Sequence, residues 1–279
     1  MTMTSRSAWT WRVVAGCTAA IVAACAPDPV TAPTPFVPTS QSIVTGVAVQ
    51  GVDLGAGASA PFVATARFNE GADQNVTNHV QWTSSESSVA TVGPTGVVTG
   101  VAPGAVEIRA TYGGAIGRFA ILVSGVGDYL AYVSELGDPL GLGTFDYVRE
   151  NSTFSLGQIS GPSWIFSSPK GERLTVTGFR QAGASFSGEV YSLTMQSTPG
   201  RSVLAGTFEN AELYPNQPDG VPGLEFRINN RGCTTARGRF VVREAQTVPV
   251  NGVSRLHATF QIRCNGRPEM LRGEVSYGR

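Results

Sequence analysis

The feature that most constrains this chain is a succession of short runs in which apolar and polar residues alternate. Residues 105–112 (AVEIRATY) place Val106, Ile108 and Ala110 on one side of an extended chain and polar side chains on the other. A period of two is that of a β-strand with one buried face. The 34 glycines and 17 prolines supply turns between such runs. The sequence therefore predicts an all-β chain, a β-sandwich followed by a second β-sandwich or jelly-roll-like domain.

Length and charge narrow the classes of protein further. At about 100–200 residues per domain, 279 residues suit two domains, and a hydrophobic content of 42% excludes a disordered chain. The formal net charge is zero and the arginines are scattered along the sequence, so we expect no nucleic-acid partner. The two histidines, His79 and His257, lie far apart in the sequence, which argues against a His-rich metal site. We expect no cofactor and no metal.

Residues 1–24 have the pattern of an export signal. Arg6 and Arg12 precede an uncharged, mostly apolar run at residues 13–24, which is too short for a permanent transmembrane helix. The residues Val-Ala-Ala before Cys25 resemble the lipobox of bacterial lipoprotein signal peptides, and this resemblance implies cleavage and lipidation at Cys25. Cys17 follows a similar string, but cleavage there leaves an apolar region of about three residues. An ordinary secretory signal with an incidental Cys25 is the alternative.

Residues 25–41 are expected to hold the protein away from the membrane. Five prolines in residues 26–41 favour a polyproline II stalk of up to about 50 Å behind the lipidated cysteine. Acyl chains such as palmitate bind the membrane through buried methylene groups. The expected location is therefore the cell envelope or cell surface, or the outer membrane if the cell has one.

Residues 42–124 contain seven short alternating runs, as a β-sandwich requires. The stretch from Trp82 to Gly114 resembles the bacterial Ig-like domain, group 2. It carries the "VATV" strand, the "GVVTGV" strand, "APG" and a closing Tyr-Gly-Gly. The resemblance implies that the first domain is an Ig-like β-sandwich, followed by the second β-sandwich or jelly-roll-like domain, and that it is a spacer or adhesion unit of bacterial surfaces. Trp82 lies within an alternating strand, which favours a core position over a sugar-stacking platform.

Residues 125–279 carry about ten further candidate strands, separated by turns such as Pro-Asp-Gly and Asn-Gly. Cys233 and Cys264 are predicted to form a disulfide, since paired cysteines in an exported domain are usually oxidised. Leu256, Phe260 and Cys264 share the predicted core face of residues 256–264, whereas His257 shares the opposite face with Arg255 and Arg263 and is expected to be solvated.

The end of the chain resembles a C-terminal domain of exported bacterial proteins whose function is unassigned. The matching motifs lie at residues 208–211, 222–224, 231–233, 238–244, 260–264 and 273–277. Asn230 and Thr234 replace the Gly and Asn that are usual in that family, so the loop between them differs. The resemblance indicates a fold and no chemistry.

Candidate site residues are few. Five carboxylates in the second domain are available for glycoside hydrolysis, although nothing in the sequence pairs them: Glu209, Glu212, Asp219, Glu225 and Glu244. Calcium ligands or turn-formers are the alternatives for three aspartates: Asp128, Asp138 and Asp146. Four aromatic residues are candidates for ligand stacking or for core packing: Trp164, Phe166, Tyr191 and Tyr214.

The sequence favours a non-enzymatic surface lipoprotein. We expect adhesion, or binding of a cell-surface or extracellular glycan or protein, with the Ig-like domain as a spacer. We expect no catalytic residue, because there is no GxSxG motif and no free cysteine in the mature chain. The alternatives are a polysaccharide hydrolase or its accessory subunit, and a purely structural envelope protein.

Overall fold

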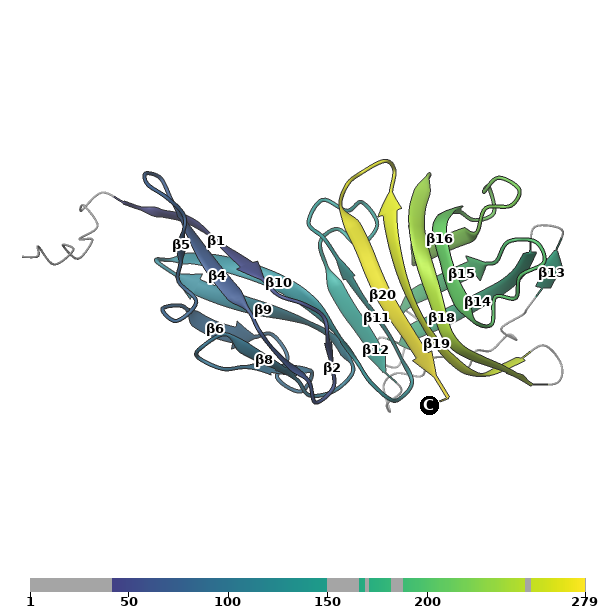
Figure 1. The fold of residues 1–279 in the computed structure, drawn as a ribbon, viewed down its shortest axis with the longest axis horizontal. Coiled ribbons are helices and arrows are strands. Elements are labelled where there is room, and N and C mark those ends of the chain that lie inside the picture. Colours follow the sequence, from purple (N-terminus) through teal and green to yellow (C-terminus); the bar gives the residue numbers. More distant parts are fainter. Residues whose placement is uncertain (1–41, 150–165, 169–170, 182–187, 249–251, 279) are drawn as a thin grey trace, which may run out of the picture. The chain divides into compact units, whose positions relative to one another are not determined.

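A computed structural model describes residues 42–149, 166–168, 171–181, 188–248 and 252–278 (Figure 1). These residues form strands, turns and loops and contain no helix, which confirms the all-β fold class. Accordingly, the described residues include no helix with the length and hydropathy of a membrane span. Cys25, the predicted stalk and Trp164 lie outside the described residues.

The first ten strands form three small sheets around one core. The sheets have the orders β1-β4-β5, β2-β10-β9-β6 and β3-β8-β7. Alternation in β9 is as predicted, since Val106, Ile108 and Ala110 are fully buried. The strands are β1 (Val44–Gln50), β2 (Leu54–Gly55), β3 (Ser59–Pro61), β4 (Val63–Phe68), β5 (Gln74–Asn75), β6 (Gln81–Ser84), β7 (Ala90–Val92), β8 (Val97–Gly100), β9 (Gly104–Tyr112) and β10 (Ala115–Ser124).

Trp82 anchors the core of this Ig-like region. Its side chain packs in the hydrophobic cluster with Phe62 and Ile121, and the residue is only 9% exposed. The indole Nε1 donates a hydrogen bond to the carbonyl oxygen of Thr77 at 2.9 Å. The buried polar atom is thus satisfied, and the ring is not a platform for a sugar.

The other ten strands form one sheet with the order β12-β11-β20-β19-β18-β16-β17-β15-β14-β13. Neighbouring strands are antiparallel except for the parallel pair β16 and β17. The strands are β11 (Tyr129–Ser134), β12 (Phe145–Arg149), β13 (Phe166–Ser168), β14 (Gly171–Gln181), β15 (Gly188–Gln196), β16 (Gly206–Leu213), β17 (Gly223–Ile228), β18 (Ala236–Val248), β19 (Gly252–Cys264) and β20 (Met270–Tyr277).

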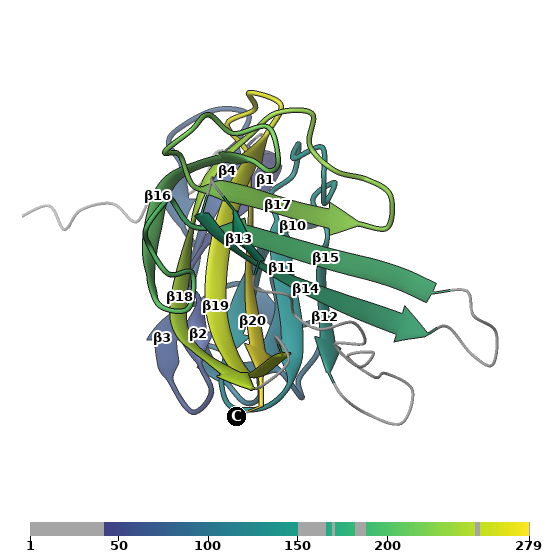
Figure 2. The same cartoon turned by 90° about the vertical axis from the view of Figure 1, so that its right-hand side faces the viewer.

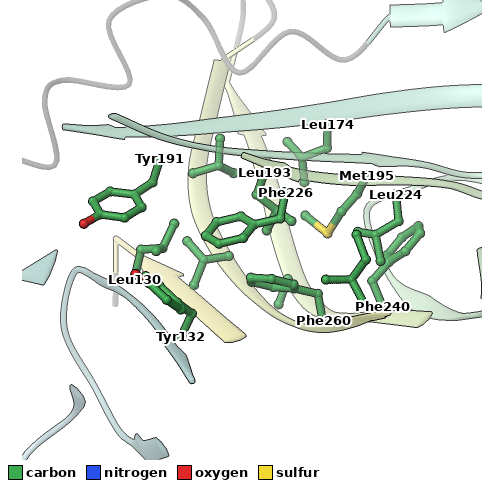
Figure 3. Packing of buried hydrophobic residues seen from close by; sticks show 14 of the residues in the cluster. Leu130, Tyr132, Leu174, Tyr191, Leu193, Met195, Leu224, Phe226, Phe240 and Phe260 are labelled. Atoms are coloured by element: carbon green, nitrogen blue, oxygen red, sulfur yellow. The ribbon is translucent and has the colours of Figure 1, made fainter. Parts of the chain in front are cut away.

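This sheet bends so strongly that its two halves cover each other. In Figure 2, β14, β15 and β17 run across the direction of β18, β19 and β20. Figure 3 shows Leu193, Met195 and Phe226 from the first half facing Tyr132 and Phe260 from the second. The two layers of the predicted sandwich are therefore halves of one continuous sheet rather than two separate sheets.

The structure contains the predicted disulfide between Cys233 and Cys264, whose Cα atoms are 5.2 Å apart. Cys264 is fully buried on the core face of β19, together with Leu256 and Phe260. The bond ties the turn before β18 to the end of β19, which are 31 residues apart in sequence.

His257 differs from the prediction, because it is half-buried rather than solvated. Its Nε2 atom lies 2.8 Å from Oε1 of Glu274, and the same oxygen accepts a hydrogen bond from the hydroxyl of Tyr129 at 2.6 Å. A polar residue on the outer face of a sheet is solvated only where no other side chain covers it. Here the side chain of Glu274, on the neighbouring strand β20, contacts His257.

Candidate functional site

The strands β16, β18 and β19 run side by side in the large sheet (Figures 1 and 2). The outer face of the sheet is hollowed at these strands. Two adjoining hollows of about 480 Å³ each share Glu212, Arg237 and Arg263. We call the pair the arginine groove. Its charged and amide side chains are those of Glu209, Asn210, Glu212, Arg237, Arg239, Gln261, Arg263 and Arg267.

A β-bulge in β16 supplies one wall of the groove. Phe208 pairs with Phe240 and Ala211 pairs with Gly238, so two residues of β16 oppose one residue of β18. Asn210 has a φ of 54°, the left-handed conformation that asparagine tolerates better than most residues. Because Phe208 and Ala211 both point into the core, Glu209 and Asn210 both remain on the exposed side. The bulge thus adds a polar side chain to the groove.

The hairpin of β18 and β19 supplies the arginines. Arg237 is directly opposite Arg263, and Arg239 is directly opposite Gln261. Directly opposed residues on one face of a sheet have Cβ atoms about 5 Å apart, and like charges there are destabilising. At Gly238, between the two arginines of β18, a Cβ would meet the backbone of Gln261, so the close approach of the strands requires glycine.

Electrostatically the groove has an excess of positive charge, with four arginines against two glutamates. Arg239 and Glu209 form an ion pair of 3.5 Å, and Arg237 and Glu212 form one of 3.8 Å. The side chain of Arg237 is nevertheless 85% exposed. Exposed ion pairs of this length contribute little to stability, so these guanidinium groups remain available to a ligand.

The side chains that line the groove are of types that can bind anions. A guanidinium group presents a planar set of donors that matches a carboxylate or phosphate with two parallel hydrogen bonds. The amides of Asn210 and Gln261 add groups that both donate and accept. Among the described residues that line the groove there is no aromatic ring.

The structure brings only two of the five candidate carboxylates, Glu209 and Glu212, into one site. Glu225 pairs with Arg227 at 3.0 Å and Glu244 with Arg255 at 3.5 Å. A glycosidase needs one carboxyl group kept protonated, typically in an apolar pocket, together with an ionised partner. Glu209 and Glu212 instead lie beside arginines in an open groove. Asp219 lies in the exposed turn before β17.

The Tyr191 ring does not lie on the surface. It is fully buried, and its hydroxyl lies 2.6 Å from Oδ2 of Asp146 and 2.5 Å from Oε2 of Glu189. Burial, with a contribution from these two carboxylates, raises the pKa of Tyr191 far above its ordinary value. Burial likewise raises the pKa of Tyr132, whose ring centroid is 5.9 Å from that of Tyr191. Tyr191 therefore presents no face to a ligand in solution.

Tyr214 is half-buried in the loop after β16 and forms a cis peptide bond with Pro215. Its hydroxyl accepts a hydrogen bond from Arg173, whose guanidinium carbon lies 5.6 Å from the ring centroid. The arginine occupies the position over the ring that a stacked sugar requires. Phe166 begins β13, but its side chain, like Trp164, falls outside the described part.

The three candidate aspartates serve separate local roles. Asp138 is fully buried and accepts hydrogen bonds from the Ser134 hydroxyl at 2.8 Å and the Gly141 amide at 2.7 Å, as a turn-former does. Asp128 accepts one from the Gly278 amide at 2.6 Å, and Asp146 lies on β12. Within the described ranges, no group of three or more His, Cys, Asp or Glu side chains is arranged to hold a metal ion.

The sequence does not reveal the arginine groove as a cluster of charge, because its arginines are not neighbours along the chain. Arg237 and Arg239 are separated by about 25 residues from Arg263, and only the hairpin register joins them. The alternation of residues in these strands does contain a pattern that indicates the groove. Arginines at alternate positions of one strand, with an arginine on the outer face of the next, predict a positive strip once the strands are paired.

The comparisons identify one part of the chain. Residues 43–116 match the family model of the bacterial Ig-like domain (group 2). Domains of this family occur in bacterial surface or exported proteins. No curated protein matches the sequence.

Proposed function

Because residues 43–116 are a bacterial Ig-like domain of group 2, we propose that this protein is a lipid-anchored surface protein whose C-terminal domain binds an extracellular glycan or protein. The observation that carries the proposal is the arginine groove: four arginines, two of them directly opposed, on an open face of the large sheet. The lipobox-like residues before Cys25 and the prolines that follow support the anchor and the stalk. The Ig-like domain then serves as a spacer.

We propose binding rather than catalysis for the groove. Charged groups that cost stability are commonly retained where they contact a ligand. The opposed pair Arg237 and Arg263 is such a case, since removal of either charge relieves a repulsion. The two glutamates of the groove lie beside arginines, with the side chain of Glu209 exposed and that of Glu212 half-buried, an arrangement suited to orienting arginines rather than to acid–base chemistry.

The test is binding of the full chain to extracellular material. Labelled protein is incubated with intact cells and with the polymer that the producing cells release, and bound protein is measured. The Arg237→Gln and Arg239→Gln double variant is expected to lose most of this binding. Arg255→Gln is the matched control, because Arg255 lies on β19 outside the groove and is similarly exposed. Equal binding by the double variant and the unchanged protein would contradict the proposal.

A further inference from the structure

We propose that the arginine groove binds a polyanionic glycan, a sugar polymer with carboxylate or phosphate groups at repeated positions. This inference rests on the proposed function and names its ligand. The three properties of the groove that support it are its charge, its length and the position of its strands within the sheet.

The charge of the groove selects an anion. The whole chain has a formal net charge of zero, yet this face carries four arginines and two glutamates. The backbone register holds the Cα atoms of Arg237 and Arg263 opposite each other, although Arg237 pairs with Glu212 at 3.8 Å and Nε of Arg263 donates to the Pro268 carbonyl oxygen at 3.0 Å. An anion bound between the two guanidinium groups accepts charge-assisted hydrogen bonds from both and offsets their repulsion. Binding is therefore strongest for a ligand that places negative charge at this position.

The length of the groove selects a ligand with more than one charge. The two hollows overlap at Arg237 and Arg263, and they extend to Arg239 in one direction and to Arg267 in the other. Residues two apart on a strand are about 6.8 Å apart, so Arg237 and Arg239 contact different groups of an extended ligand. A single small anion fills one end only. A polymer with repeated charges contacts both ends at once and gains in affinity from their linkage.

The surroundings of the arginines favour a glycan over an acidic protein segment. At Arg237 and Arg263 the strands β18 and β19 are each paired on both sides, so a peptide has no free strand edge to extend beside these arginines. Sugar hydroxyls both donate and accept, and the groove offers them the amides of Asn210 and Gln261 and the carboxylates of Glu209 and Glu212. The carboxylate side chains of an acidic peptide carry no hydroxyl group to donate to these acceptors.

The experiment measures binding of the full chain to four immobilised polymers. Polygalacturonate supplies carboxylates, phosphomannan, a mannose polymer with phosphate groups, supplies phosphates, dextran is a neutral glycan, and poly-glutamate is an acidic polypeptide. We expect binding to at least one of the two acidic polymers that are not polypeptides, with none to dextran and weaker binding to poly-glutamate. Added salt is expected to weaken it, because the arginines are exposed. Binding to the carboxylate polymer would indicate a uronate ligand, and binding to the phosphate polymer would indicate a phosphate ligand.

Variants locate the binding in the groove. The Arg237→Gln and Arg239→Gln double variant is expected to lose at least about tenfold in affinity, and Arg255→Gln to retain it. Arg267→Gln, in the turn after β19, provides a second variant whose exposed side chain makes misfolding of little concern. Thermal unfolding of each variant supplies the folding check. Because Arg237 faces Arg263, Arg237→Gln is expected to leave the melting temperature unchanged or to raise it.

Two results overturn the inference. In the first, poly-glutamate binds as tightly as the acidic glycans, which makes the ligand an acidic protein. In the second, neither polygalacturonate nor phosphomannan binds, while the double variant still loses binding to extracellular material. Both leave the proposed function in place. If the double variant binds extracellular material as the unchanged protein does, the proposed function itself fails.

Discussion

Removal of the disulfide is expected to destabilise the C-terminal domain by a predictable amount. Cys233 and Cys264 are 31 residues apart in sequence, and the bond closes this loop in the unfolded chain. In the chain-entropy model, closure of a loop of this length contributes about 3.7 kcal/mol at 25 °C. Cys264 is also fully buried, so its truncation to alanine leaves a small cavity that costs about 1 kcal/mol more. The double variant Cys233→Ala and Cys264→Ala is thus expected to lose about 4–5 kcal/mol.

Equilibrium unfolding in guanidinium chloride measures this loss. The oxidised protein, the same protein with reductant, and the double variant are compared by circular dichroism. Reductant is expected to lower the midpoint of the C-terminal transition in the unchanged protein and to leave the variant unaffected. Residues 42–124 contain no cysteine, so the transition of the Ig-like domain is an internal control. A loss below about 1 kcal/mol, with an unchanged dependence on denaturant, would refute the loop-closure reasoning.

Three further predictions concern other parts of the chain. Trp82→Ala is expected to destabilise the Ig-like domain by about 3–5 kcal/mol, because it leaves a cavity and an unpaired Thr77 carbonyl; Trp82→Phe should cost clearly less in the same denaturation assay. Because the pKa of Tyr191 is raised in the folded protein, the unfolded chain loses this proton first, and the free energy of unfolding is expected to fall as the pH rises above about 10. Tyr191→Phe should make this fall smaller in urea titrations at increasing pH. Cys25→Ser is expected to move the protein out of the membrane fraction on cell fractionation, and its retention there would contradict lipid anchoring.

The alternation of residues in β19 allowed its core face to be predicted without any structure. Leu256, Phe260 and Cys264 are buried as expected, because a period of two fixes which side chains share a face. The same reasoning placed Trp82 correctly, since it depends only on the residues around it in sequence.

The site was harder to predict because it depends on pairing between strands. The bulge at Asn210 interrupts the alternation of β16, because Glu209 and Asn210 both lie on its exposed side. Neither the bulge nor the opposition of Arg237 and Arg263 follows from local pattern, since both require the register of neighbouring strands. His257 shows the same limit, because its burial depends on Tyr129 and Glu274.

The division of β18 and β19 into two faces has a consequence for how such a domain diversifies. Phe240 and Phe260 hold the fold together from within, while the arginines that line the groove alternate with them along the same strands. Exchange of the outward residues alters the charge and the hydrogen-bonding groups of this surface without removing a core side chain. The chemistry of the face can therefore change through a handful of codons, on a frame that already folds.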